Sequence, residues 1–401
     1  MLFSHVLSSK LVAACLMSWC ALFFDGVCVS ALSSAEPAPA TDLIVYVGTY
    51  TRGTESEGIY RCKLNMTTGE LQQLGVTREI DNPSFLEIHA SGRFLFCVNE
   101  VGDFQGASSG AISAFAISPE DGSLRFLNRT SSGGAAPCHL VIDRGGRNVL
   151  VANYTGGSVA SLPIGPDGQL GTITTLVQHQ GTSVDPRRQK GPHAHSINLD
   201  SANQFAVVAD LGLDKLLVYR FDAKKGTLTA NATLGIAITP RSGPRHFAFH
   251  PNGRFGYVIN EMALTVTALA YNPQRGVFST LQTIATVPDG VDRKGLSTAE
   301  IRVHPTGKFL YGSNRGHDSI AVYRIEPESG RLALIEIEPT QGKTPRNFFI
   351  DPTGTFLLAE NQSSCTIVVF RIDQATGALS ATGHVAQIPA PVCIRMLALA
   401  R

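Results

Sequence analysis

The tripeptide Gly-x-Leu, once in the form Gly-x-Phe, follows a short polar turn seven times along this chain. Successive copies begin between 46 and 58 residues apart. Strand-like runs fill the intervals, and a repeat period near fifty residues with such runs is typical of a radial β array. The pattern therefore predicts seven repeats of one β unit. The seven copies begin at Gly69, Gly122, Gly168, Gly226, Gly276, Gly330 and Gly377.

A second landmark, a tight hairpin turn, precedes the tripeptide in six of the repeats. A strand such as 247–249 enters this turn, another such as 255–259 leaves it, and a third such as 319–323 follows. The Gly-x-Leu turn and a weaker fourth strand complete the unit, and four antiparallel strands make one propeller blade. The landmark turns are 89–92, 143–146, 200–203, 250–253, 304–307 and 351–354.

The two ends of the repeat region supply the missing strand. Residues 390–396 align with the entering strand at 344–350, whereas the first repeat begins directly at residues 43–47. The last strand would therefore complete the first blade and leave no free sheet edge. The sequence predicts an all-β fold over residues 43–401, a seven-bladed β-propeller with four antiparallel strands per blade and N-to-C strand closure.

The N-terminal segment differs from the repeats. Lys10 precedes an apolar run, residues 11–24, and small residues follow around Ala31 and Ala35. This arrangement predicts a signal peptide over residues 1–31 and a linker over 32–42, hence an exported protein, periplasmic or secreted. An uncleaved membrane anchor is the alternative, but the run is short for a membrane span, which favours export. If there is no leader here, the chain would be cytoplasmic.

Composition argues against several other classes of function. Only 16% of residues are charged and the formal net charge is +1, with no basic run, which argues against a nucleic-acid partner. Five scattered cysteines outside the leader do not form a disulfide framework, and we expect Cys97 and Cys365 in the core. No ligand spacing for a metal is present, so neither a metal nor a cofactor is expected. We also expect a monomer, with no membrane contact beyond the signal peptide.

Positions close to the landmark turns carry the candidate chemistry. The entering strands are polar at their start and apolar at their end, so the polar starts should meet at one mouth of the central channel. An Asn or Asp at the end of each outgoing strand should shape the loops there. The ionic residues differ from blade to blade, which is typical of a site, although structural ion pairs Arg245–Glu261 and Arg302–Glu300 are the alternative. The candidates are His193, His195, Arg245, His246, Glu261, Glu300, Arg302, Arg346 and Asn347.

This set of side chains suits ester or lactone hydrolysis. A carboxylate or a neutral imidazole could take a proton from water, and a fixed guanidinium could stabilise the oxyanion at the carbonyl carbon. A second arginine could hold a phosphate or carboxylate with two hydrogen bonds. The sequence contains neither a Gly-x-Ser-x-Gly nucleophile elbow nor a Walker-type phosphate loop.

Six short motifs in order resemble the propeller-type 6-phosphogluconolactonases, whose fold the carboxy-muconate cyclases share. The resemblance covers residues 43–401. The motifs are Tyr-Val-Gly-Thr-Tyr at 46–50, Gly-Pro-His-Ala-His at 191–195, Gly-Pro-Arg-His at 243–246, Ile-Asn-Glu at 259–261, Ala-Glu-Ile-Arg-Val-His-Pro at 299–305 and Pro-Arg-Asn-Phe at 345–348.

The resemblance implies hydrolysis of 6-phospho-D-glucono-1,5-lactone to 6-phosphogluconate without a required metal. It implies His195 (rather than His193), Arg245, Glu261 and Arg302 as catalytic residues, with Glu261 or His195 as the base. Arg302 and Arg346 would then hold the substrate anion. Another lactone hydrolase, a muconate-type cyclase and a non-catalytic ligand- or protein-binding propeller are the alternatives. An exported protein would require a lactone found outside the cytoplasm, in place of this cytosolic sugar phosphate.

Overall fold

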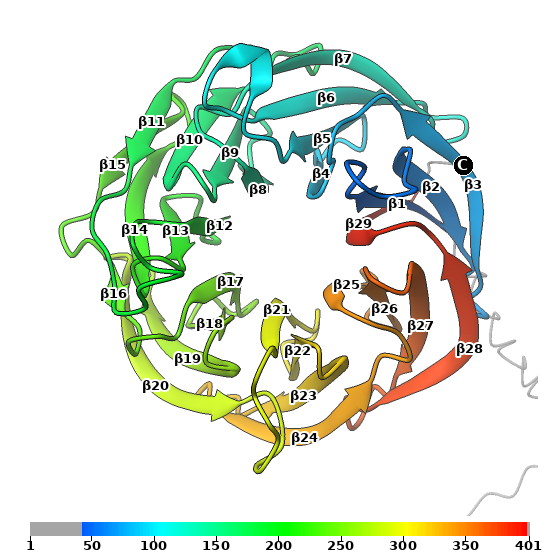
Figure 1. Cartoon of the computed structure of the whole chain (residues 1–401), viewed down its shortest axis with the longest axis vertical. Coiled ribbons are helices and arrows are strands. Elements are labelled where there is room, and N and C mark those ends of the chain that lie inside the picture. The colour runs from blue at the N-terminus through cyan, green and yellow to red at the C-terminus, as the bar shows by residue number, and fades with distance from the viewer. Residues whose placement is uncertain (1–41, 399–401) are drawn as a thin grey trace, which may run out of the picture. The chain divides into compact units, whose positions relative to one another are not determined.

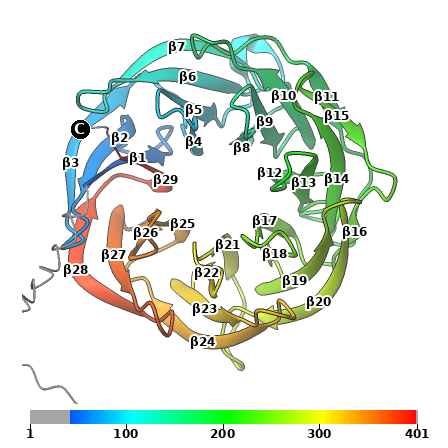
Figure 2. The same ribbon diagram turned by 180° about the vertical axis from the view of Figure 1, so that it is seen from behind.

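The computed structural model describes residues 42–398 and forms seven sheets around one axis (Figures 1 and 2). Each sheet has four antiparallel strands from axis to rim, with one short extra strand in one sheet, so the predicted seven-bladed propeller is confirmed. The blade of β17 (Pro244–Phe249), β18 (Phe255–Asn260), β19 (Thr265–Asn272) and β20 (Val277–Ala285) shows the plan.

The other blades repeat this plan. Their inner strands are β4 (Leu86–Ile88), β8 (Pro137–Ile142), β12 (Ala194–Leu199), β21 (Ser297–Val303), β25 (Pro345–Ile350) and β29 (Pro391–Leu397). Their second strands are β1 (Leu43–Thr49), β5 (Phe94–Asn99), β9 (Asn148–Asn153), β13 (Phe205–Asp210), β22 (Phe309–Arg315) and β26 (Phe356–Asn361).

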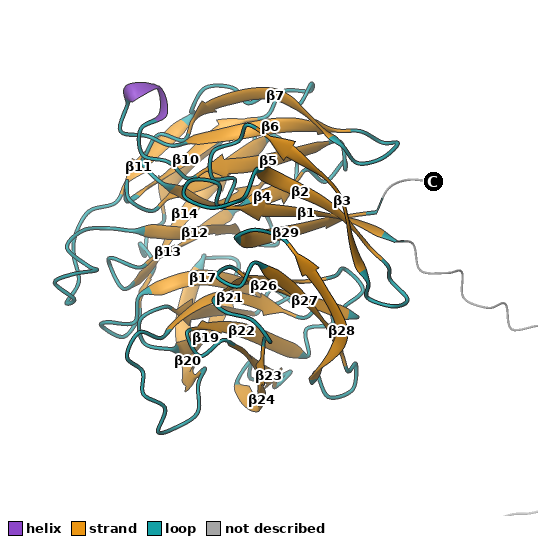
Figure 3. Cartoon of the chain, turned by 45° about the vertical axis from the view of Figure 1, so that its right-hand side comes forward, coloured by secondary structure: helices purple, strands orange, loops and turns teal. Residues whose placement is uncertain are grey.

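The third and fourth strands form the outer half of each blade. The third strands are β2 (Gly58–Leu64), β6 (Ala111–Ile117), β10 (Ser158–Pro163), β14 (Lys215–Asp222), β23 (Ser319–Ile325) and β27 (Thr366–Ile372). The outermost are β3 (Leu71–Arg78), β7 (Leu124–Ser131), β11 (Thr175–Gln178), β15 (Thr227–Ala230), β24 (Leu332–Pro339) and β28 (Leu379–Gln387). A short strand β16 (Ile236–Ala237) adds to β14, and a 3-10 turn η1 (Phe104–Gly106) is the helical element in Figure 3.

The first blade joins the two ends of the described chain. Strand β29 pairs with β1 in antiparallel register, from Ile44 opposite Leu397 to Gly48 opposite Cys393. The predicted strand closure is therefore confirmed, and in Figure 1 the red strand lies beside the blue ones. Closure pairs the edge that β1 would otherwise expose. It also gives the first blade its inner strand, β29, so that each of the seven blades has an inner strand at the axis.

The Gly-x-Leu turns are the joints between neighbouring blades. Each of the seven glycines has a positive φ, between 64° and 85°. A Cβ at Gly330 would come within 2.5 Å of the Phe255 ring of the preceding blade. Tyr257 of that blade donates a hydrogen bond to the Gly330 carbonyl at 3.1 Å. Glycine is therefore required both by the left-handed backbone and by the close approach of the next blade.

The Asn residues that end the second strands hold loop backbone, as the sequence predicts, except Asn260, whose amide donates to the side chains of Thr265 and Thr267 in β19. The amide nitrogens of Asn153, Asn314 and Asn361 donate to loop carbonyls at 3.0, 2.8 and 3.2 Å. Asp210 occupies the same position in its blade, where it accepts from the backbone nitrogens of His193 and Leu213 at 2.8 and 3.1 Å and also pairs with His179 at 2.6 Å. These residues therefore shape the loops around the channel.

Two predictions fall on other parts of the chain. Cys97 is buried as expected, but the prediction for Cys365 is wrong, because that residue lies half-buried in the turn before β27 with a φ of 56°. The signal peptide and nearly all of the linker lie outside the described residues. Within residues 42–398, no helix has the length and apolar character needed to cross a membrane.

Gly330→Ala should lower the free energy of unfolding by about 2–4 kcal/mol, because a methyl group would combine left-handed strain with a clash against Phe255. Gly75→Ala in β3 is the matched control, since its new Cβ would meet only the end of the Arg61 side chain at 3.8 Å. Urea titrations of both variants measure the difference. Equal stability of the two variants would contradict the role of this turn as a joint.

Candidate active site

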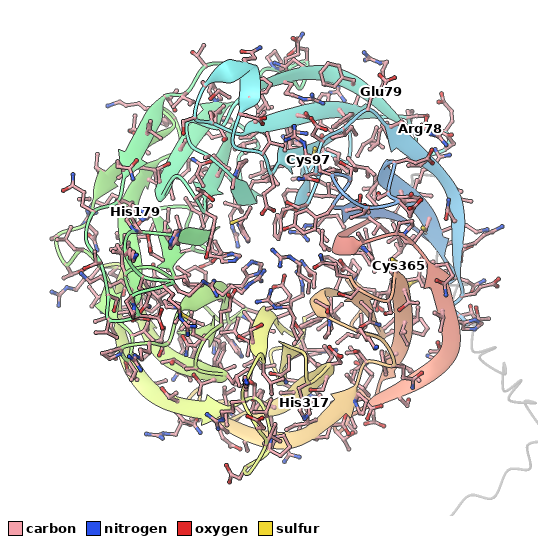
Figure 4. All side chains as sticks on the ribbon, viewed as in Figure 1. Arg78, Glu79, Cys97, His179, His317 and Cys365 are labelled. Atoms are coloured by element: carbon pink, nitrogen blue, oxygen red, sulfur yellow. The ribbon has the colours of Figure 1, made fainter. Side chains whose placement is uncertain are left out.

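The inner strands begin, and the second strands end, at the same end of the channel. Pro244 at the start of β17 pairs with Asn260 at the end of β18, and the same register recurs in β25 and β26. Polar residues near these positions therefore meet at one mouth. Figure 4 shows side chains projecting into the central space that the ribbons leave open.

Glu261 is the centre of the charge cluster at this mouth. Its carboxylate lies 3.1 Å from Arg245 Nε, 3.0 Å from Arg315 Nη2 and 2.7 Å from Arg188 Nη2. Burial opposes its ionisation, but Arg315 and Arg245 outweigh burial and hold the pKa of Glu261 far below its usual range. A carboxylate with so low a pKa is a weak base at neutral pH.

His195 lies beside this carboxylate as a buried, neutral imidazole. Its Nε2 is 3.8 Å from Glu261 Oε2, and its Nδ1 is 3.6 Å from Cys138 Sγ. Burial, reinforced by the Arg245 guanidinium, lowers the pKa of His195 well below its usual range. The ring is therefore uncharged at neutral pH.

A second carboxylate, Glu100, organises the other side of the mouth. Tyr50 Oη and Ser84 Oγ donate to its Oε2 at 2.8 and 2.5 Å, and Arg346 Nη2 donates to Tyr50 Oη at 2.8 Å. Between the two carboxylate networks lies a void of about 10 Å³, close to the space that one water occupies. Its polar lining is Tyr50, Ser84, Glu100, His195, Arg245, His246, Arg346 and Asn347.

A larger cavity of about 320 Å³, here called the far cavity, occupies the other half of the channel, and all seven inner strands contribute to its lining. Phe85, His139 and His246 separate it from the mouth, with the His139 centroid 4.2 Å from that of Phe85 and 5.3 Å from that of His246. Glu300 and Arg302 line this cavity. The channel therefore contains two separate polar sites.

The structure divides the predicted set of site residues. The residues that it brings together at the mouth are His195, Arg245, Glu261, Arg346 and Asn347. His193 lies nearby and stacks on Tyr154 at a centroid separation of 4.6 Å. His246 lies in the partition between the two sites.

The single-mouth prediction is wrong for Glu300 and Arg302. Glu300 is bound to His246 at 3.2 Å and faces the far cavity. Arg302 lies two residues further along the extended strand β21, about 7 Å further from the mouth than Glu300. The two structural ion pairs that were the alternative to a functional site are also present. They are Arg245–Glu261 at 3.1 Å and Arg302–Glu300 at 3.7 Å.

Several residues of the mouth were not among the candidates. Glu100, Tyr154 and Arg315 stand at the same distance from their landmark turns as Glu261, so the repeat register was a signal for all three. Arg188 comes from the long connection between β11 and β12, which has no periodic pattern. Its position depends on contacts with Tyr154 and Glu261 from other blades.

Comparison with known proteins agrees with this architecture. The model of the family described as "Lactonase, 7-bladed beta-propeller" matches residues 44–396. The chain belongs to this lactonase family.

Two relatives of this lactonase-family chain are 37% identical to it and are named 6-phosphogluconolactonase. The one from Bacillus subtilis aligns over 89% of this chain and 99% of its own length, and the one from Formosa agariphila over 77% and 86%. The solved structure of a periplasmic gluconolactonase from Pseudomonas aeruginosa is 32% identical. It has a TM-score of 0.84 and covers 90% of this chain and all of its own.

The buried histidines of this lactonase should make its stability depend on pH. Burial lowers the pKa of His139, His195 and His246 well below the usual value of 6.5, so the unfolded chain binds three more protons below that pH. Burial raises the pKa of Glu360, so in the same range the folded chain keeps one proton that the unfolded chain loses. The three protons gained by the histidines of the unfolded chain, less the one that Glu360 keeps in the folded chain, leave two more protons on the unfolded chain. Acid therefore favours the unfolded state.

The free energy of unfolding should therefore fall by roughly 2 kcal/mol between pH 7 and pH 5.5, and Glu360→Gln should roughly double that fall by removing the opposing group. Urea titrations at several pH values measure both slopes. A flat profile for the native chain, or a shallower one for Glu360→Gln, would contradict the assigned protonation states.

Proposed function

We propose that this chain hydrolyses a sugar δ-lactone at the mouth that contains Glu261 and His195. The observation that carries the proposal is a neutral, buried imidazole, His195, beside a water-sized void that Arg245 and Arg346 also line. A water molecule, a base and two guanidinium groups are the parts that hydrolysis of a ring ester requires.

The reaction would proceed by direct attack of water. His195 takes one proton as the water oxygen bonds to the lactone carbonyl carbon, and Arg245 and Arg346 stabilise the negative carbonyl oxygen. The bond from that carbon to the ring oxygen then breaks, and the proton on His195 passes to the departing oxygen. The product is the open-chain hydroxy acid.

Glu261 has a positioning role in this scheme. Its low pKa makes it a poor proton acceptor, whereas its contacts at 3.1 and 3.0 Å fix the guanidinium groups of Arg245 and Arg315. His195 is the better candidate of the two bases that the resemblance leaves open, because guanidinium groups occupy both carboxylate oxygens of Glu261, whereas the His195 ring borders the void. Cys138 is excluded as a nucleophile, because burial raises the pKa of its thiol far above neutrality.

The names of the relatives support two substrates of one class. The Bacillus and Formosa proteins are named for 6-phosphogluconolactone, and the Pseudomonas protein for gluconolactone. The Arg188 side chain is 44% exposed at the mouth, so it is the cation best placed to meet a 6-phosphate. We propose 6-phospho-D-glucono-1,5-lactone as the substrate, with unphosphorylated gluconolactone as the second candidate.

Arg245→Ala should reduce kcat/KM for these lactones by about 10²- to 10³-fold, the usual effect of removing an oxyanion donor. Acid release from δ-gluconolactone and from its 6-phosphate, each corrected for spontaneous hydrolysis, is the measurement. Arg254→Ala, which changes an exposed arginine of the same blade, is the control and should leave turnover unchanged. Turnover of Arg245→Ala within twofold of the native chain would refute the role. Lack of acceleration by the native chain would favour a ligand-binding propeller.

A further inference from the structure

The far cavity presents a guanidinium group whose two terminal nitrogens make no hydrogen bond to the residues that the structure describes. Arg302 donates through Nε to the Phe348 carbonyl at 2.8 Å. Its Nη2 is 3.7 Å from Glu300 Oε2, which is too long for a hydrogen bond. Among residues 42–398, neither terminal nitrogen of Arg302 has a hydrogen-bond partner. The two nitrogens therefore form a fork at the wall of the cavity that keeps its hydrogen-bonding capacity, although Nη2 is within ion-pair distance of Glu300.

This fork is fixed in place before any ligand arrives. The guanidinium carbon of Arg302 lies 4.5 Å from the centroid of the Phe349 ring, and the bond from Nε prevents rotation about the end of the side chain. The side chain keeps 22% of its surface exposed, so a solute can reach it. A rigid planar fork of this kind binds a carboxylate with two parallel hydrogen bonds at little entropic cost.

The other polar groups of the cavity suit hydroxyl groups. Glu87 is bound to Arg395 at 3.1 Å and keeps 26% of its side chain exposed, and Asn198 lines the wall with an amide that can both donate and accept. The volume of about 320 Å³ is at the lower end of the range for small-molecule sites. A compact ligand rich in hydroxyl groups matches both features.

The cavity lining carries two guanidinium groups, Arg302 and Arg395, and two carboxylates, Glu87 and Glu300, so a single negative charge on the ligand is tolerated better than two. Glu300 is already shared between His246 and the backbone nitrogen of Ile301. Burial raises the pKa of Glu360 well above its usual range, so this nearby carboxyl does not neutralise Arg302. Glu87 and Glu300 would repel a dianion such as a phosphate monoester, whereas a carboxylate needs only the one fork.

We propose that the far cavity is a second binding site, which takes the carboxylate of a small polyhydroxylated acid on the terminal nitrogens of Arg302. The partition of Phe85, His139 and His246 separates it from the mouth, so a ligand can occupy it while the mouth is empty. The proposed lactone hydrolysis releases an acid of this class, but the assignment follows from the groups in the cavity and stands without that reaction.

Calorimetric titration with D-gluconate tests this site in the native chain and three variants. Arg302→Gln should weaken binding at least about tenfold, because it removes a charge-assisted double hydrogen bond, and Arg302→Lys should restore only part of it. Arg245→Ala should retain the far-cavity binding, and Arg254→Gln should behave as the native chain does. Sorbitol, which has the hydroxyl groups without the carboxylate, should bind at least about tenfold more weakly than gluconate.

Other results would overturn the proposal. The proposal fails if Arg302→Gln leaves the binding of gluconate unchanged, or if Arg245→Ala abolishes it. It also fails if the native chain binds inorganic phosphate as tightly as gluconate, or does not bind gluconate. Lactone turnover by the same preparations tests the mouth separately, so the two proposals can fail independently. If Arg302→Gln does not fold, a crystal structure of the native chain soaked in gluconate tests whether gluconate binds in the far cavity. A carboxylate against Arg302 supports the site, and an empty far cavity at saturating gluconate refutes it.

Discussion

The carboxylate of Glu261 holds together guanidinium groups that would otherwise repel one another. Arg188, Arg245 and Arg315 come from three separate parts of the chain and contact it within 3.1 Å. Taking charges out of water is costly, so such a cluster persists only where each charge has partners. With Arg346 and Glu100 included, four positive groups face two negative ones, and the net charge of +2 favours an anionic ligand or transition state.

Ring closure is what brings these groups to one place. The glycine joints set each blade against the preceding one, and the pairing of β29 with β1 completes the circle. The same closure gives the channel two ends with different chemistry. A partition of aromatic and imidazole rings divides them, with a water-sized void on one side and the far cavity on the other. Hydrolysis and binding of an acid can therefore occupy opposite ends of one axis.

The repeat pattern was sufficient to predict the blades, their strand order and the closing strand, because a glycine with positive φ and a close neighbour leaves few alternatives. It also predicted which strand ends meet, and so placed Arg245, Glu261 and Arg346 together. It failed for Arg302, because counting residues does not reveal how far along a strand the partition lies. Arg188 could not be predicted, since its loop has no period and its place depends on side chains of other blades.

The most direct test of the central claim is a crystal structure of the native chain with gluconolactam, a sugar lactam that mimics the lactone ring and resists hydrolysis. If hydrolysis takes place at the mouth, the lactam lies there, with its carbonyl oxygen within hydrogen-bond distance of Arg245 or Arg346 and its carbonyl carbon facing the void beside His195. A lactam bound only in the far cavity beside Arg302, with the mouth empty, would show that the mouth is not the site of hydrolysis.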